Sequence, residues 1–451
     1  MSRSAVSIIM AAAALVTLVT LAASLRRARA AGDLDASSAL TLGMGWLMSL
    51  PIALVAISGG LSRRPNVFGQ LVPANPGWLD RAIDMSVLLV ALLASVLLLR
   101  QLVAEQVPIH LAGVFAVLLW AVAQVSGLHV GSPTLRGAVL LLCFLAATVL
   151  PRGRGAALGA GIFGVTLAVS SGLLAVLRHD VTFVVPCEGA CGGLGFTGVF
   201  PNPDLLGIAL AASIPFAYLG FRDRARSWFI LYLAGMAVAT GSQTATVAAV
   251  ISVAALLVVR PDLERDRPGG GRTAIAGLVL AAALCGSVYV LRHDWDPSAL
   301  TDRPILWNVA SDYVERSPWF GYGPHKWELL VASGEIPRAA ERSAHNQWMD
   351  VLFGAGWVGL ALIVGVLVAT VVSAGNGRAG VLLAAATTTM IGTAEGIWSI
   401  GAIDFLSFSL VALILTGQPQ REPRLSPRRA RTPLAHAALF RRRAEPAPVR
   451  E

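Results

Sequence analysis

The stretch from Ser343 to Leu360 reads SAHNQWMDVLFGAGWVGL and passes from a polar pair directly into a long apolar segment. We interpret it as the start of a helix that enters a membrane, with the titratable imidazole of His345 at the entry point. The composition supports this interpretation, because 55% of the residues are hydrophobic and only 14% are charged. One soluble core cannot hold so many apolar residues, so the sequence predicts a polytopic membrane protein.

Apolar runs of about 20 residues, the length that a helix needs to cross a bilayer, recur along the chain. They are rich in Ala, Leu and Val and lack the alternation of apolar and polar residues typical of a transmembrane β-barrel. The predicted fold is an all-α polytopic membrane protein with 12 to 13 transmembrane helices and one large helical extracytoplasmic loop. The predicted spans are residues 4–25, 38–58, 84–104, 107–127, 134–150, 156–178, 204–220, 227–241, 243–259, 273–291, 346–373, 379–397 and 401–416.

These spans divide the chain into five predicted parts. They are N-terminal transmembrane helices at 1–178, central transmembrane helices with a short outer cysteine loop at 179–291, the large extracytoplasmic loop at 292–344, C-terminal transmembrane helices at 345–416 and a basic, disordered cytoplasmic tail at 417–451.

Arginine placement predicts the orientation, because cytoplasmic loops carry the excess of Lys and Arg. Arginines cluster around residues 26–29, 152–154, 222–226 and 260–272, and the tail from Gln418 holds nine Arg against three Glu. These segments are predicted to be cytoplasmic, which places residues 179–203, 240–243 and 292–344 outside. The tail is expected to contact anionic lipid headgroups and not nucleic acid.

The four cysteines do not form a disulfide framework. Cys143 and Cys285 lie in apolar runs and are expected to pack as small hydrophobic residues. Cys187 and Cys191 share an outer loop, where a local disulfide and two free thiols are both open outcomes. No histidine stands near this pair, so no zinc site is predicted.

The large outer loop carries helix signals of its own. Thr301 or Asp302 is expected to cap a helix that ends at Ser317-Pro318. A Gly/Pro turn follows, and then a short amphipathic helix that stops near Gly334. Ser343 is expected to cap the helix that re-enters the membrane. The loop is predicted to fold back over the outer mouth of the bundle.

Six motifs in and around this loop carry a resemblance. They are FTGVFPNPDLLG at 196–207, TGSQTA at 240–245, RPILW at 303–307, SPWFGYGP at 317–324, AHN at 344–346 and GAGWVG at 354–359. In this order, over roughly residues 190–400, they resemble the O-antigen ligase and polymerase family of bacterial envelope glycosyltransferases. One departure is Gln243, which stands where the family usually has an Arg.

The resemblance implies a GT-C-like, inverting and metal-independent glycosyltransferase without a cofactor. Its donor would be a glycan on a polyprenyl diphosphate, such as undecaprenyl diphosphate, and its acceptor a hydroxyl of a glycan, a lipid or a protein. The site would lie on the extracytoplasmic side of the cytoplasmic (inner) membrane of a bacterium, in contact with membrane lipids. The sequence does not distinguish a ligase from a polymerase or from a protein O-glycosylating enzyme, and it identifies neither the sugar nor the acceptor.

The chemistry of such a reaction suits two residues of the loop. A diphosphate leaving group needs a permanent positive charge with paired hydrogen-bond donors, and Arg303 is the candidate for this clamp. An acceptor hydroxyl needs a general base, and His345 is the candidate for this role or for orienting the acceptor. The alternatives are an interfacial imidazole that only reaches toward water and a solvated loop arginine that pairs with Asp302.

Six further residues are candidates for substrate binding: Asn346, Asn202, Asp204, Gln243, Lys326 and Tyr322. Asn346 either orients the imidazole or the acceptor, or only caps the following helix. Asp204 is either a plain helix cap or faces the same outer cavity. Because Gln243 carries no charge, diphosphate binding would depend more on Arg303 and Lys326.

Two acids and one alternative function stay open at this stage. Glu395 and Asp404 lie in an apolar context where acids are costly and often functional, although a wet turn would also accommodate them. A polytopic transporter or a lipid-linked glycan flippase would also have many helices, but its polar residues should lie at mid-membrane and not in an outer loop. The sequence contains neither a Gly-x-x-x-x-Gly-Lys-Ser/Thr phosphate-binding loop nor a His-Glu-x-x-His zinc motif.

Overall fold

The computed structural model describes residues 3–58, 62–65, 71–74, 76–104, 107–128, 134–183, 195–222, 224–263, 270–293, 295–296, 303–336 and 343–417. The helices and strands are α1 (Arg3–Ala30), α2 (Ala36–Ser58), β1 (Ser62–Pro65), β2 (Leu71–Ala74), α3 (Leu79–Leu102), α4 (Leu111–Gly127), α5 (Leu135–Val149), α6 (Arg154–Leu177), α7 (His179–Thr182), α8 (Pro203–Gly220), α9 (Ala225–Thr240), α10 (Gln243–Val259), α11 (Gly271–Arg292), α12 (Arg303–Arg316), α13 (His325–Ser333), α14 (Gln347–Ser373), the 3-10 turn η3 (Gly375–Gly377), α15 (Arg378–Gly392) and α16 (Phe408–Leu415).

Long apolar helices dominate the described chain, as expected of a polytopic membrane protein. Among the described residues, seven helices are long and apolar enough to cross a membrane, namely α1, α2, α3, α6, α8, α11 and α14. Four shorter apolar helices, α4, α5, α9 and α10, accompany them. The predicted number of 12 to 13 spans is not confirmed by this count.

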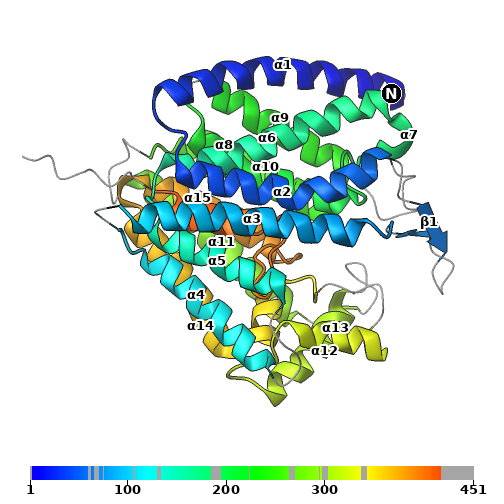
Figure 1. Ribbon diagram of the computed structural model, residues 1–451, viewed down its shortest axis with the longest axis vertical. Coiled ribbons are helices and arrows are strands. Elements are labelled where there is room, and N and C mark those ends of the chain that lie inside the picture. The colour runs from blue at the N-terminus through cyan, green and yellow to red at the C-terminus, as the bar shows by residue number, and fades with distance from the viewer. Residues whose placement is uncertain are drawn as a thin grey trace, which may run out of the picture. The chain divides into compact units, whose positions relative to one another are not determined.

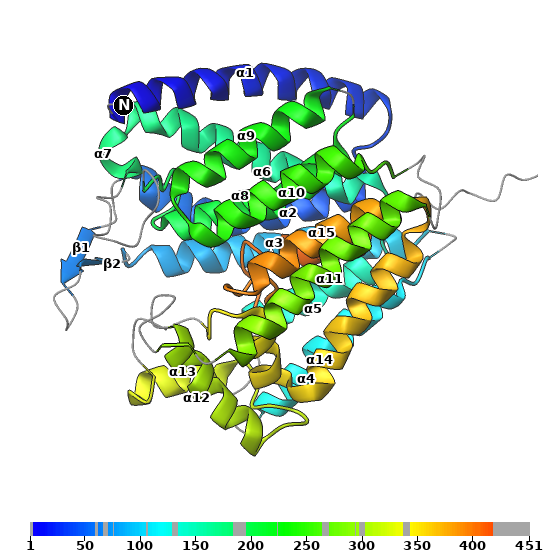
Figure 2. The same ribbon diagram turned by 180° about the vertical axis from the view of Figure 1, so that it is seen from behind.

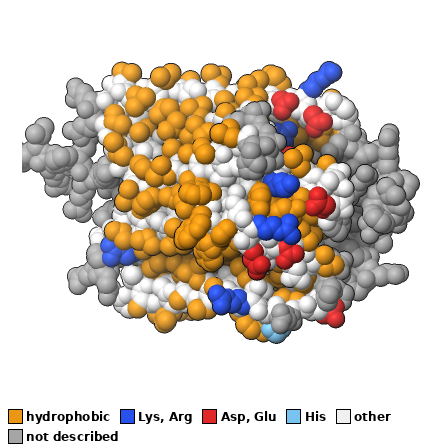
Figure 3. All heavy atoms as spheres, turned by 90° about the horizontal axis from the view of Figure 1, so that it is seen from below, with side chains coloured by type: hydrophobic (Ala, Val, Ile, Leu, Met, Phe, Trp, Pro, Cys, Tyr) orange, Lys and Arg blue, Asp and Glu red, His pale blue; other side chains and the backbone are white. Residues whose placement is uncertain are grey.

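The helix faces that point away from the core of the bundle are apolar. On α3, Leu92 and Leu99 are each more than 60% exposed. Figure 3 shows one face of the molecule on which hydrophobic side chains cover a broad area, while most of the charged side chains gather toward one end. An exposed apolar surface of this extent is what a bundle surrounded by lipid presents.

The core of the bundle forms where α6 packs against α8, the two most buried of the long helices. Small residues make this contact close: a Cβ placed on Gly161 would lie 2.7 Å from the Cα of Ala217. Such a close approach of two backbones is typical of helix pairs in membranes, where packing and not the hydrophobic effect joins helices. The long α8 is thereby fixed, and its N-terminus holds two of the candidate site residues.

Residues 303–336, from the predicted outer loop, form a small helical layer, and they contain the two helices that the sequence predicted there. Helices α12 and α13 lie beside one another near the start of α14 (Figures 1 and 2). Their apolar faces form a separate cluster that includes Trp307, Trp327 and Leu330 and packs on Met349 and Phe353 of α14. Helix α12 ends before Ser317, and α13 ends at Gly334 with a left-handed φ of 82°, as the sequence predicted. The expected caps Thr301 and Asp302 lie outside the described residues.

The Gly-Tyr-Gly turn of the loop joins directly to a break in α14. At Gly356 the backbone is not helical, with φ 62° and ψ −162°. The N–H groups of Tyr322 and Gly323 donate to the carbonyls of Phe353 and Gly354 at 2.8 and 2.9 Å. The turn therefore satisfies carbonyls that the break sets free, so the two glycine motifs of the sequence form one hydrogen-bonded unit.

Aromatic side chains surround this junction. The side chains of Trp319, Phe320 and Trp357 are all about half exposed or more. The backbone N–H of Trp357 donates to the carbonyl of Pro318 at 2.8 Å. Exposed tryptophans of a membrane protein concentrate at the level of the lipid headgroups. The exposed aromatic side chains at this junction fit a position at a membrane interface.

The last two predicted spans are wrong in their bounds. Helix α15 ends at Gly392 instead of residue 397, and the predicted span 401–416 contains only the eight-residue α16. Residues 393–407 between them form turns, although they are apolar enough to read as helix. Side chains supply the hydrogen bonds that a helix would have made: Asp404 accepts from the N–H groups of Leu406 and Ser407 at 2.9 Å each.

Other differences from the sequence prediction are smaller. The first helix extends to Ala30, so the arginines of 26–29 lie in its last turns and not in a loop, and residues 62–65 pair with 71–74 as two antiparallel strands. Cys143 is buried as expected, whereas Cys285 is exposed on α11 and does not pack inside. Cys187, Cys191 and the basic tail from residue 418 lie outside the described residues.

Candidate functional site

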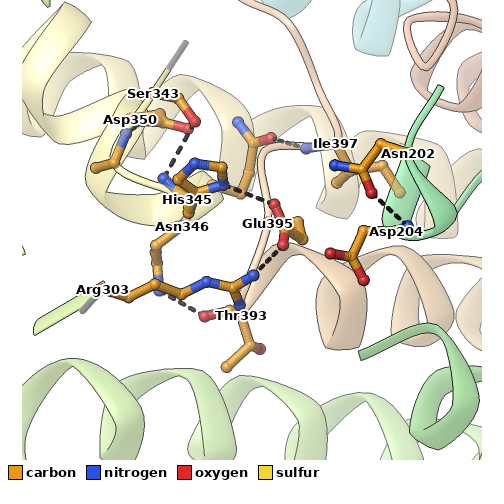
Figure 4. A network of polar contacts seen from close by, with 12 residues as sticks. Asn202, Asp204, Arg303, Ser343, His345, Asn346, Asp350, Thr393, Glu395 and Ile397 are labelled. Carbon is orange, nitrogen blue, oxygen red and sulfur yellow. Dashed lines mark hydrogen bonds and ion pairs between the residues drawn. The ribbon is translucent and has the colours of Figure 1, made fainter. Parts of the chain in front are cut away.

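Three side chains from distant parts of the chain meet where the loop layer joins α14 (Figure 4). Glu395 forms an ion pair with Arg303 through Oε1 and Nη2. Its other oxygen, Oε2, lies 2.9 Å from Nδ1 of His345. The Glu395 side chain is 12% exposed, Arg303 19% and His345 32%, so the imidazole is the most accessible group of the three.

Helix α12 positions the arginine. Arg303 is its first residue, and Trp307 follows one turn later on the same face. The indole N–H of Trp307 donates to the carbonyl of Ala344 at 2.9 Å. One helix therefore presents the guanidinium to Glu395 and fixes the residue that precedes His345, which explains the Arg-x-x-x-Trp spacing in the sequence.

His345 has an uncommon backbone conformation, with φ 51° in the left-handed region. Its N–H donates to Ser343 Oγ at 3.1 Å, and Asp350 Oδ1 accepts from the N–H of Ala344 at 2.9 Å. These contacts hold the strained backbone in place. Strain of this kind concentrates at sites where a side chain must be presented in one direction.

The two residues after His345 bind the segment that carries Glu395. Asn346 Nδ2 donates to the carbonyl of Thr393 at 2.7 Å. Gln347 accepts from the N–H of Ile397 at 2.9 Å and donates to the carbonyl of Trp398 at 2.9 Å. Both amide side chains are buried. The three residues His345, Asn346 and Gln347 thus hold the segment 393–398, and Glu395 lies between the residues that Asn346 and Gln347 bind.

Asn346 also caps α14, because its Oδ1 accepts from the N–H groups of Trp348 and Met349 at 3.0 and 3.1 Å. The predicted cap was Ser343, which is wrong: three residues separate it from the first helical position, and it binds His345 instead. Since both ends of the Asn346 amide are engaged, its observed role is structural.

The start of α8 lies near this turn. Figure 4 draws Asn202 and Asp204 in the same view as Glu395. The ring of Phe200 contacts the ring of Phe405 at a centroid distance of 4.9 Å, which joins the segment before α8 to the segment after Glu395. The cap of α8 is Asn202, whose Oδ1 accepts from the N–H of Asp204 at 2.8 Å, so the prediction of Asp204 as the cap is wrong.

Three predicted binding residues have their described contacts outside the network around Glu395. Gln243 is exposed at the first position of α10, where Ser242 is the cap. Lys326 places its Nζ 5.7 Å from the centroid of the Tyr313 ring. Tyr322 packs its ring against Tyr313 and Phe353 in the aromatic cluster of the loop layer. Lys326 and Tyr322 thus stabilise the layer that carries Arg303.

The sequence prediction missed Gln347 and left Glu395 open. Glu395 stands 50 residues after His345, so nothing in the local sequence around Glu395 indicates that the two side chains make contact. Gln347 did have a signal: three consecutive polar residues, His-Asn-Gln, stand at the start of an otherwise apolar helix. Asp404, the other open acid, binds the turn before α16 as a capping residue.

Arg303 can donate further hydrogen bonds, and His345 can accept a proton. A guanidinium carries five N–H donors, and the ion pair with Glu395 engages Nη2. The imidazole meets Glu395 through Nδ1, so Nε2 is the ring nitrogen left to take a proton. Among the described residues, no group of three or more His, Cys, Asp and Glu side chains is placed to hold a metal ion.

A groove of about 820 Å³ lies elsewhere, between α1 and α9, lined by Val19, Arg27, Arg224 and Trp228 among others. It is open to the surroundings and contains none of the candidate site residues. The polar network around Glu395 is therefore the candidate site.

One of three comparisons with known proteins found a match. A model of the O-antigen ligase family matches residues 228–364, which confirms the resemblance for that part of the chain. The matched part runs from α9 into α14 and contains Arg303 and His345, whereas Glu395 lies beyond it. No curated protein and no solved structure matches the chain.

Proposed function

Because a model of the O-antigen ligase family matches residues 228–364 of this chain, we propose that the protein transfers or polymerises a glycan from a polyprenyl diphosphate-linked donor onto a hydroxyl acceptor. The observation that carries the proposal is the meeting of His345 and Arg303 on the two oxygens of Glu395. A base and a cation from separate elements, held together by one carboxylate, suit a reaction with a hydroxyl nucleophile and an anionic leaving group.

Arg303 binds the diphosphate in this proposal. The glycosidic bond to the carrier breaks as the diphosphate departs with its electron pair, and negative charge develops on the phosphate oxygen. A guanidinium stabilises this charge through bidentate hydrogen bonds and never loses its own charge. The N–H groups that Glu395 does not engage are available for this contact.

His345 acts as the general base. Nε2 takes the proton of the acceptor hydroxyl while the acceptor oxygen attacks the anomeric carbon from the side opposite the diphosphate. The carbon–oxygen bond to the acceptor forms as the bond to the diphosphate breaks, so the configuration at the carbon inverts. Glu395 accepts a hydrogen bond from Nδ1–H and stabilises the imidazolium. No step requires a metal ion or a cofactor.

The reaction takes place at the extracytoplasmic surface of the cytoplasmic membrane. The arginine clusters of α1 and of residues 222–226 support this side, because they lie in segments predicted to be cytoplasmic. The exposed aromatic residues near Gly356 support a position at a membrane interface. A lipid-linked donor would present its diphosphate at this depth.

The test is an assay with purified protein in sealed liposomes, with a glycan on undecaprenyl diphosphate and a hydroxyl acceptor, in which both glycan transfer and movement of the donor between leaflets are measured. We expect a glycosylated acceptor and free undecaprenyl diphosphate in equal amounts. Movement of the donor between leaflets without any transfer would contradict the proposal and favour a flippase.

A further inference from the structure

We infer that Glu395 is a positioning residue that the donor diphosphate separates from Arg303, so that donor binding prepares His345 for proton transfer. This inference rests on the proposed function and adds an order to it: the donor must bind before the base is fully supported. Glu395 lies outside the part of the chain that matches the family model.

The geometry shows one carboxylate shared between two partners. Oε1 contacts Arg303 and Oε2 contacts His345, so both oxygens of Glu395 are engaged. The carboxylate cannot move far, because Asn346 and Gln347 fix the backbone on both sides of it at Thr393 and Ile397. Loss of the Arg303 contact at Oε1 must therefore alter the electrostatic interaction of Oε2 with His345.

The negative charge of the donor diphosphate determines how the donor affects the ion pair between Glu395 and Arg303. Without donor, Glu395 neutralises Arg303 in a setting where both side chains are less than one fifth exposed. A diphosphate carries more negative charge than a carboxylate and presents more acceptor oxygens to the same guanidinium. It therefore competes with Glu395 for Arg303.

The competition has a consequence for the base. When the diphosphate takes the guanidinium, the negative charge of Glu395 is no longer shared and acts on the imidazole alone. An unshared carboxylate stabilises the imidazolium that forms when Nε2 takes the acceptor proton. Asp350 is the other acid near His345, and it is engaged with the N–H of Ala344, so Glu395 is the carboxylate on the ring.

The variant Glu395→Gln separates the two effects because it keeps the shape of the side chain and removes its charge. Arg303 no longer has a competing anion, so we expect undecaprenyl diphosphate without a glycan to bind about three- to tenfold more tightly. The imidazolium loses its support, so we expect kcat to fall by about 10² or more. A purely structural role would weaken binding and lower kcat together. The matched control is Glu328→Gln, whose carboxylate is 72% exposed on α13 and should change neither value.

A second variant covers the case in which Glu395→Gln does not fold. Glu395→Asp keeps the charge on a shorter stem, so it should bind undecaprenyl diphosphate within about threefold of wild type and lower kcat at least about tenfold. Inorganic pyrophosphate, measured alongside, should show the same ratio between variants if the diphosphate alone carries the competition.

The binding measurement needs no turnover, so it distinguishes the two proposals. Absence of transfer by wild type would contradict the proposed function, whatever the binding result. Weaker binding of undecaprenyl diphosphate to folded Glu395→Gln than to wild type would overturn the competition between Glu395 and the donor, even if transfer is observed.

Discussion

Nδ1 of His345 and Oε2 of Glu395 lie 2.9 Å apart although the two residues are 50 positions apart in the chain. The contact exists because the start of α14 and the turn after α15 are joined by the amide side chains of Asn346 and Gln347. The geometry of the proposed site depends on the packing of three elements, α12, α14 and the segment 393–398.

Arg303→Lys tests the clamp. Lysine keeps the charge and still reaches Glu395, but it lacks the planar fork that pairs with two phosphate oxygens. We expect transfer to fall by about 10²-fold, the loss seen when one aligned donor is removed from a developing anion. The melting temperature should stay near that of wild type, because the ion pair is kept. Wild-type activity in the lysine variant would leave Arg303 only a general electrostatic role.

Gly356→Ala tests the junction between the loop turn and α14. The position has φ 62°, and an added Cβ would lie 2.3 Å from the carbonyl carbon of Trp319. The left-handed backbone alone costs about 1–3 kcal/mol for a residue with a side chain. We expect a clear loss of thermal stability in detergent.

The matched control for this junction is Gly277→Ala on α11, where a Cβ would meet nothing within 4 Å. It should be neutral or raise stability by up to about 1 kcal/mol, since alanine favours the helix. Equal effects of the two substitutions would contradict the role given to the break at Gly356.

Gln347→Leu tests the support of Glu395. The substitution leaves the N–H of Ile397 and the carbonyl of Trp398 buried without their partner, at about 1–3 kcal/mol for each group. We expect lower stability and also lower transfer, because the turn that carries Glu395 is released. Gln347→Glu restores the acceptor but not the donor, so it should lie between leucine and wild type in both measurements.

The orientation is tested by cysteine labelling in intact cells. In a parent with the four native cysteines replaced by alanine, Leu329→Cys on α13 should react with a membrane-impermeant thiol reagent, since Leu329 is 48% exposed in the outer loop layer. Gly271→Cys, at the start of α11, should react only after the membrane is opened. The reverse pattern would place the site on the cytoplasmic side.

Local signals in the sequence were sufficient for part of this fold. Gly334 marks the end of α13 because a left-handed residue terminates a helix most easily when it is glycine. Ser317-Pro318 marks the end of α12 for a similarly local reason. His345 became a candidate because a titratable group stands at the start of an apolar segment, whereas Arg303 became one through the resemblance to the family.

What depends on distant contacts could not be read from the sequence. Residues 393–407 are apolar enough to be taken for helix, and hydrogen bonds from side chains stabilise turns there, among them those of the buried Gln347 amide and of the Asp404 carboxylate. The partner of His345 likewise required the packing of α15 against α14. Hydropathy reports how apolar a segment is, and it does not report which side chain from elsewhere satisfies its backbone.

The central claim is that His345 takes the proton of the acceptor, and turnover by purified His345→Asn measures it most directly. Asparagine tolerates the left-handed backbone at this position, so the variant should fold, but it cannot accept the proton. His293→Gln, an exposed histidine after α11, is the control and should transfer like wild type. We expect His345→Asn to bind undecaprenyl diphosphate normally and to transfer glycan about 10² to 10⁴ times more slowly. Transfer at the wild-type rate by the folded variant would contradict the account.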